Sequence, residues 1–295
     1  MIQMRQQRLD FVCGQESGLP ADEDYMRWDT GEMFIYCGVR RVKRADGTWP
    51  KTRSKAGNCF ILSKEIADAF VAGGRKMRRV GPRLSTLQFA MQKVEVVIVN
   101  VHFPDSDRRK RLEHEAMCGR VDDILQKVSR DVVLTWMGDF NASLGVATDA
   151  SDSVCGTHGN THRNAAGTTI RNMAARYDMV DLVSHYPQEV GGTWVHMRSK
   201  NFHLIDRVFV RQQDKRRVQE CRIEGMLTDS DHYTVRVCLS VERPRPLPKT
   251  TRQNRRRLGY SKRLQAQHLR NNRRRRYEES WMDTRRRMGG TLTPT

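Results

Sequence analysis

The sequence lacks a long hydrophobic run, and this excludes a simple membrane protein. No apolar stretch approaches the roughly 18 residues that a membrane-spanning helix needs, and the opening MIQMRQQRLD lacks the apolar segment of a signal peptide. The seven cysteines are scattered and form no CxxC pair, so we expect neither a zinc site nor a disulfide framework. These absences predict an intracellular protein with reduced thiols and no membrane partner.

Acidic residues are scarce at one end of the chain only. Between Arg243 and Arg287, 17 lysines and arginines stand against three acidic residues, so this segment carries +14 of the net charge of +19. The prolines of ERPRPLPK (242–249) favour extended backbone before it. We predict a folded domain over residues 1–242 and a basic tail over 243–295, largely disordered or partly helical. The tail is either a nucleic-acid contact or a solvated linker.

The first part of the chain alternates β-rich and helical patterns. The expected strands are 33–39, 57–63, 84–91, 94–101, 132–137, 204–210, 218–224 and 233–241, and the expected helices are 109–129 and a segment through Ile170, Ala174 and Tyr177. Residues 84–91 and 94–101 are separated by two residues only, which predicts a hairpin. Hairpins mixed with crossover helices indicate a layered α/β or α+β fold.

Polar residues interrupt this pattern in four places. Glu16 follows a short apolar run in DFVCGQES, and Asp206 lies inside the apolar strand HLIDRVFV, where a carboxylate is costly unless it is paired. LTDSDHYTV supplies Asp231 and His232 before the last strand. GDFN supplies Asp139 and Asn141, which an extended strand would place on one face. Each stretch also has a local interpretation, because Gly-Asp-x-Asn and Asp-Ser-Asp-His are typical of turns.

In their order these stretches resemble the motifs of the endonuclease/exonuclease/phosphatase superfamily, the DNase I-like fold, over roughly residues 1–242. The motifs are QES (15–17), GDFN (138–141), ID (205–206) and SDH (230–232). GNTHRNAAG (159–167) and GGTWVH (191–196) resemble linking segments in the endonuclease domains of non-LTR retrotransposons. The resemblance implies an α/β (α+β) four-layer sandwich, with two packed mixed β-sheets flanked by helices.

The resemblance also implies roles for individual residues. Glu16 and Asp231 would hold Mg²⁺, with Mn²⁺ as a substitute. Asp139 would take a proton from the attacking water, and Asn141 would orient it or contact the phosphate. His232 would donate to a phosphate oxygen, and Asp206 would fix its tautomer. Asp105 and Asn164 match phosphate-side positions more loosely.

Two departures from the family pattern bear on activity. His102 in VHFPD stands where the family has a tyrosine, which keeps a donor ring but changes its reach. The family's first strand, which carries an asparagine at the metal site, has no counterpart before MRQQRLDFVCGQES. We therefore expect a truncated, weakly active fragment of a retrotransposon polyprotein, ending in the basic connector before a reverse transcriptase.

The leading functional hypothesis is a Mg²⁺-dependent DNA endonuclease that acts in the nucleus and nicks a target site. A phosphoinositide or other phosphoester phosphatase on the same fold is one alternative, because fold does not fix the substrate. A catalytically dead nucleic-acid-binding remnant is another. Comparing the nicking of plasmid DNA with the hydrolysis of inositol phosphates distinguishes the endonuclease from the phosphatase. Metal-dependent turnover distinguishes both enzymes from the non-catalytic remnant.

Overall fold

A computed structural model gives the structure of residues 2–19, 24–39, 47–48, 56–105, 107–225 and 230–241. The basic tail predicted over 243–295 lies outside these described residues, so its boundary and role stay predictions. Within the described ranges, no helix is both long and apolar enough to cross a membrane.

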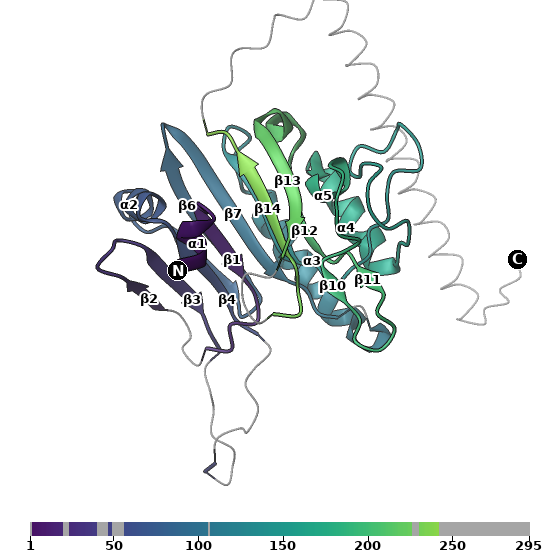
Figure 1. Cartoon of the computed structure of the whole chain (residues 1–295), viewed down its shortest axis with the longest axis horizontal. Helices are drawn as coiled ribbons and strands as arrows, with labels where there is room; N and C mark the ends of the chain where they lie inside the picture. Colours follow the sequence, from purple (N-terminus) through teal and green to yellow (C-terminus); the bar gives the residue numbers. More distant parts are fainter. Residues whose placement is uncertain are drawn as a thin grey trace, which may run out of the picture. The chain divides into compact units, whose positions relative to one another are not determined.

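A six-stranded mixed sheet forms the centre of the described structure (Figure 1). The neighbours β7 and β8 run parallel, and the other neighbouring pairs run antiparallel. Its strands, in spatial order, are β5 (Met77–Gly81), β6 (Leu84–Met91), β7 (Val94–His102), β8 (Val133–Asp139), β12 (Asp206–Arg211) and β9 (Met179–Asp181).

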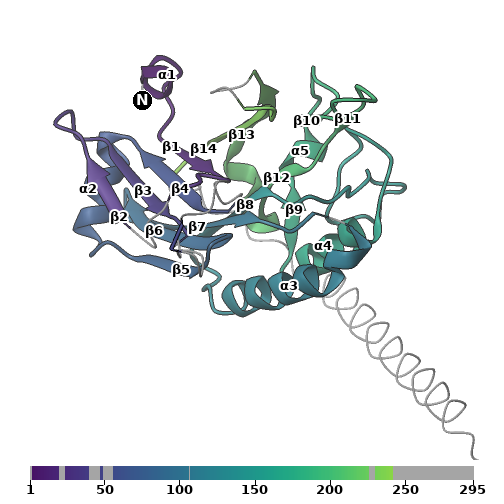
Figure 2. The same cartoon turned by 90° about the horizontal axis from the view of Figure 1, so that it is seen from below.

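The remaining strands form smaller antiparallel sheets. A four-stranded sheet has the order β1 (Phe11–Gly14), β4 (Asn58–Leu62), β3 (Met33–Cys37) and β2 (Asp24–Arg27). β13 (Val218–Glu224) pairs with β14 (Thr234–Leu239), and β10 (Trp194–Val195) pairs with β11 (Phe202–His203). Figures 1 and 2 both place β14 beside β1, and no strand ladder joins them among the described residues.

Alternation along the strands divides the core into layers. In β7, Val97, Val99 and Val101 pack with the helices α3 (Arg111–Leu125) and α4 (Ala165–Arg176). Val96 and Ile98 face the opposite way, toward the four-stranded sheet and α2 (Lys64–Ala72). α3 and α4 therefore cover the outer face of the mixed sheet (Figure 2). Short helices complete the described structure: α1 (Ile2–Gln6), α5 (Leu182–His185) and the 3₁₀ segments η1 (Arg108–Lys110) and η2 (Gln212–Arg217).

The fold class expected from the sequence is confirmed, with one difference. The six-stranded sheet is mixed, but the four-stranded sheet that packs on it is antiparallel throughout. The predicted 84–101 hairpin forms with Gln92 and Lys93 at φ +47° and +65°, so two non-glycine residues adopt the positive φ that its two-residue turn needs. The sequence analysis missed α2, whose start is marked by Ser63 capping the Ile66 N–H.

Candidate active site

Three polar side chains lie in one row across neighbouring strands of the mixed sheet. β7 and β8 are parallel, and their register pairs His102 with Asp139 where both strands end. β12 is antiparallel to β8, and its first residue, Asp206, pairs with Asp139 from the other side. Residues paired in register share a face of the sheet. The sheet therefore brings together an imidazole and two carboxyl groups that are far apart in the sequence.

β8 ends in a close approach to β7 that requires glycine. Gly138 has φ +134°, and a Cβ atom there would lie 2.0 Å from the carbonyl oxygen of Val101. The chain then turns, with Asn141 at φ +45° and its N–H donating to Asp139 Oδ1 at 2.8 Å. Of the two interpretations of GDFN, the structure has the Gly-Asp-x-Asn turn rather than an extended strand that continues through Asn141. The turn instead places its amide beside Asp139, where Nδ2 donates to Oδ2 at 3.2 Å and to the Phe103 carbonyl at 2.9 Å.

His232 joins the row through Asp206. Its Nδ1 lies 2.8 Å from Asp206 Oδ2, so Nδ1 carries the proton and Nε2 points away from this carboxylate. The start of β12 is held in turn by Thr193, whose hydroxyl oxygen accepts the N–H of Ile205 at 3.2 Å and of Asp206 at 3.0 Å. An isolated bridge between Trp194 and His232 adds a backbone link to the same segment.

The surroundings of Asp139 and His232 raise the pKa values of both side chains. Burial, followed by the charge of Asp206, raises the pKa of Asp139 to about 8. Burial disfavours the charged form of His232, but its hydrogen bond to Asp206 and the surrounding carboxylates outweigh this effect and raise the pKa of His232 to about 9. Asp139 is thus a carboxyl group that exchanges a proton near neutral pH, and His232 is an imidazolium that keeps its proton there.

Glu16 reaches the row from β1. It lies in the left-handed region at φ +53°, and its side chain is 49% exposed. Glu16 Oε1 is 3.7 Å from His102 Nε2, and Asp139 Oδ2 is 3.8 Å from the same nitrogen. The fully buried imidazole of His102 therefore lies between two carboxyl groups that the sequence analysis assigned to metal binding and proton transfer.

Asp231 lies at the other end of the row, next to His232. Its side chain is exposed, and the indole Nε1 of Trp194 donates to its Oδ2 at 2.9 Å. Of the two predicted metal ligands, Glu16 therefore lies beside His102, and Asp231 precedes His232 in the chain and is bonded to Trp194. Neither belongs to the group of potential ligands, Asp139, Asp206 and His232, whose ligand atoms lie within 4.8 Å of one another.

The donor set fits a hard divalent cation. Carboxylate oxygens dominate it, and Mg²⁺ and Mn²⁺ prefer oxygen ligands. Burial, followed by the charge of Asp206, raises the pKa of Asp139, and a cation close to this carboxyl group would offset both effects.

The two residues matched more loosely to the phosphate have local partners. Asp105 is exposed and forms an ion pair with Lys110, whose hydrogen bond lowers the pKa of its carboxyl group. Asn164 is the N-cap of α4, and its Oδ1 accepts the N–H of Gly167 at 2.7 Å and of Ser143 at 3.3 Å. Its visible role is to fix the loop that follows Asn141 to the start of α4.

A buried amide network beneath Glu16 escaped the sequence analysis. Gln15 Nε2 donates to Asn100 Oδ1 at 2.7 Å, and Asn100 Nδ2 donates to the carbonyls of Gly14 and Cys59, both at 3.2 Å. Asn58 Nδ2 donates to the Asn100 carbonyl at 2.9 Å. The network ties β1 and β4 to β7. Its signal was present, because an asparagine in the apolar run VVIVNV is as unusual as Asp206 in its strand.

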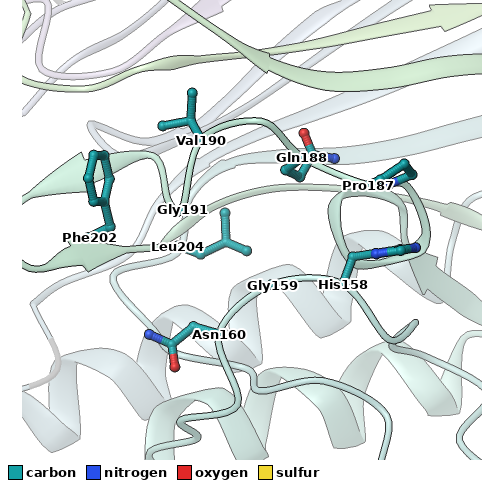
Figure 3. Close-up of a pocket in the computed structure, with 9 residues that line it drawn as sticks. All are labelled: His158, Gly159, Asn160, Pro187, Gln188, Val190, Gly191, Phe202 and Leu204. Atoms are coloured by element: carbon teal, nitrogen blue, oxygen red, sulfur yellow. The ribbon is translucent and has the colours of Figure 1, made fainter.

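A cavity of about 350 Å³ has Phe202 of β11 in its wall (Figure 3). Leu204, two residues before Asp206, forms part of its wall, but none of the predicted site residues does. The lining residues are His158, Gly159, Asn160, Pro187, Gln188, Val190, Gly191, Phe202 and Leu204.

Comparison with solved structures identifies the class of fold. No protein-family model and no curated protein sequence matches the chain. The solved structures compared below are endonucleases of the endonuclease/exonuclease/phosphatase type, and the chain has their fold. This confirms the fold that the resemblance implied.

Three neighbours are particularly informative. The endonuclease domain of TRAS1, a telomere-specific non-LTR retrotransposon, superposes with a TM-score of 0.52 at 12% identity, covering 82% of this chain and 91% of that one. The apurinic/apyrimidinic endonuclease of Leishmania major gives 0.56 at 14% identity, covering 79% of each chain. The apurinic/apyrimidinic endonuclease of Archaeoglobus fulgidus superposes with a TM-score of 0.50 at 13% identity, covering 81% of this chain and 91% of that one.

Proposed function

We propose that this protein is a divalent-metal-dependent phosphodiesterase that nicks DNA. The observation that carries the proposal is the row of His102, Asp139 and Asp206 with His232 bonded at its end. The row brings a proton acceptor, Asp139 at the end of β8, together with a proton donor, His232, which is bonded to Asp206 at the start of β12. The fold shared with apurinic endonucleases and a retrotransposon endonuclease domain supports the same chemistry.

In this proposal each side chain has one task. Asp139 takes the proton of the water that attacks phosphorus, and Asn141 holds the Asp139 carboxylate through its N–H and Nδ2. Asp206 fixes the His232 tautomer, so that Nε2–H donates to a phosphate oxygen whose charge grows during attack. His102 lies between Glu16 and Asp139, with its Nε2 3.7 and 3.8 Å from their carboxylate oxygens.

Mg²⁺, or Mn²⁺ in its place, is the proposed cofactor, and Glu16 and Asp231 are its proposed ligands. Both carboxylates are solvent-exposed, which suits an ion that retains several of its waters. When bound, the cation supplies positive charge to the phosphate and to the leaving oxygen.

DNA is the proposed partner, and a non-LTR retrotransposon is the proposed origin. Support comes from TRAS1 among the structural neighbours and from the +14 segment Arg243–Arg287, whose cations would release counterions from DNA. We further propose that the parent polyprotein continues into a reverse transcriptase and that the protein acts in the nucleus. If the tail contacts DNA, deleting residues 243–295 flattens the salt dependence of binding.

Supercoiled plasmid tests the proposal directly. We expect nicking with Mg²⁺ or Mn²⁺, none in excess EDTA, and none by His232→Ala. Inositol phosphates presented under the same conditions test the phosphatase alternative, and turnover of these alone would reject the endonuclease. Cleavage that persists without metal would reject the proposed chemistry, and binding of DNA without any turnover would favour the non-catalytic remnant.

A further inference from the structure

We propose that Arg83 forms an anion subsite in the candidate active site and binds a non-bridging oxygen of the scissile phosphate. The inference rests on the proposed function and adds a residue that no motif marks. Arg83 Nη1 lies 3.5 Å from His102 Nε2. Glu16 Oε1 and Asp139 Oδ2 approach that same nitrogen at 3.7 and 3.8 Å. The guanidinium therefore borders the space in which the proposed base and the proposed metal ligand meet.

The local structure holds Arg83 in this position. Its carbonyl oxygen accepts the N–H of His102 at 2.9 Å, which continues the β6–β7 ladder, and Nη1 also donates to the Phe103 carbonyl at 3.4 Å. Pro82 precedes it with a fixed φ, and the Pro82 carbonyl accepts the Gly57 N–H at 2.8 Å. Within the described residues, the side-chain contacts of Arg83 engage Nη1 alone, which leaves the Nε–H and Nη2–H donors for a ligand.

The charge of Arg83 is not spent on an ion pair within the described residues. Lys110, the nearby lysine, is already paired with Asp105. Arg83 has no carboxylate within salt-bridge distance in the described part of the chain, and its charge acts on Asp105 only at longer range, as a smaller contribution than that of Lys110 to the lowered pKa of that carboxyl group. The arginine is half-buried beside a carboxylate-rich site. A planar guanidinium presents donors in a fork that matches two oxygens of a phosphate. A phosphodiester is the anion that this site is proposed to receive.

A matched pair of variants tests the subsite in DNA cleavage. Arg83→Met and Arg78→Met remove the same charge from the same hairpin, but Arg78 is exposed on β5 and has no contact with the site residues. We expect Arg83→Met to lower kcat about 10²-fold with a smaller change in KM, as loss of one preorganised donor does. Arg83→Lys should recover part of this loss, and Arg78→Met should lie within about threefold of wild type. Equal effects of the two methionine variants would overturn the proposal.

Sulfur substitution identifies the phosphate that is bound. A single phosphorothioate is placed at the scissile position or at the adjacent one, as separated Rp and Sp diastereomers. We expect one scissile diastereomer to slow the wild type but to add little to the defect of Arg83→Met, because the contact is already lost. If this coupling appears only at the adjacent phosphate, or at neither, the assignment to the scissile phosphate is wrong.

A binding measurement tests the anion subsite independently of the proposed endonuclease activity. Inorganic phosphate is titrated into metal-free full-length protein while the ring nitrogens of His102 are followed by NMR. We expect a saturable shift in the wild type and in Arg78→Met, and none in Arg83→Met with an unchanged Tm. Saturation in a chain that fails to cleave DNA would support the anion subsite and reject only the endonuclease. An unshifted His102 in the wild type would reject the subsite even in an active enzyme.

Discussion

The candidate site has a buried half and an exposed half, and the two are held in different ways. His102 and Asp139 are 1% and 7% exposed and lie in register on neighbouring strands of the mixed sheet. Glu16 and Asp231 are exposed and lie just outside strands. Proton transfer benefits from desolvated groups in fixed positions, whereas a hydrated cation must be reached through water. The fold thus fixes the proposed proton-transfer groups rigidly and leaves the proposed metal ligands to flanking segments.

The largest effect should follow from changing the centre of the buried half. Asp139→Asn keeps the shape of the side chain and removes the proton acceptor, so we expect cleavage to fall by about 10²–10⁴-fold. Single-turnover cleavage of an oligonucleotide at saturating Mg²⁺ measures this loss. Asp131→Asn is the matched control, because Asp131 is exposed just before the opposite end of the same strand. Comparable losses in both variants would remove Asp139 from the proposed chemistry.

Asp206 connects the buried half to His232, and its replacement should have the next largest effect. Asp206→Asn removes the leading contact that raises the pKa of His232 from its usual 6.5 to about 9. We expect that pKa to fall toward 6.5, with a loss of cleavage of about 10–100-fold at pH 8, as for other orienting carboxylates. NMR titration of the His232 ring measures the pKa.

Asp231→Asn is the matched comparison for this titration. Asp231 also raises the pKa of His232, but it is the last of the contributing groups, and its carboxylate is bonded to Trp194. Its replacement should lower that pKa less than Asp206→Asn does. A larger drop for Asp231→Asn would show that the exposed half, rather than the buried half, sets the charge of His232.

Only part of the candidate site could be predicted from the sequence. Asp206 was identifiable because a carboxylate inside an apolar strand needs a partner, and the structure supplies His232 at 2.8 Å. For Asn141 the sequence left two interpretations open, an extended strand and a Gly-Asp-x-Asn turn. The structure has the turn, because Gly138 and Asn141 both adopt positive φ and β8 ends at Asp139. Alternation of side chains could not decide between the two.

Arg83 and Asn100 illustrate a second limit. Both act through neighbours that are distant in the sequence: Arg83 contacts the end of β7, and Asn100 joins β1 to β4. A lone arginine after a proline has no local pattern that points to a site, and its position follows only from the β6–β7 register. Asn100 carried a signal in its apolar strand, but its partners depend on the packing of two sheets.

The stability of the folded protein should fall as the pH rises through the titration of Asp139. The pKa of Asp139 is about 8 in the fold against an ordinary value of 3.8, so the folded state holds this proton more tightly. Stability present at low pH is therefore lost as the pH rises from about 4 through 8. Asp139→Asn removes that loss, and in excess EDTA we expect it to gain about 2 kcal/mol over wild type at pH 8, or roughly 4–8 °C in Tm. Calorimetry at pH 5 and pH 8 should show the gain growing with pH, and a variant less stable than wild type at pH 8 would contradict this.

The smallest predicted effect probes the exposed half through Trp194. Its indole donates to Asp231 at 2.9 Å, and its ring centroid lies 6.4 Å from that of His232. Trp194→Phe keeps an aromatic ring beside His232 and removes the donor that orients Asp231. If Asp231 is a metal ligand, this loss should raise the Mg²⁺ concentration for half-maximal cleavage by about three- to tenfold, less than the 10–100-fold of a buried orienting group. The cleavage rate at saturating Mg²⁺ should change little, because the buried row is untouched.

Trp28→Phe, at the β2–β3 turn, makes the same substitution away from the site residues and should leave the Mg²⁺ requirement unchanged. A Trp194→Phe variant with a normal Mg²⁺ requirement and a reduced maximal rate would instead place Trp194 with the buried half, as a packing partner of His232.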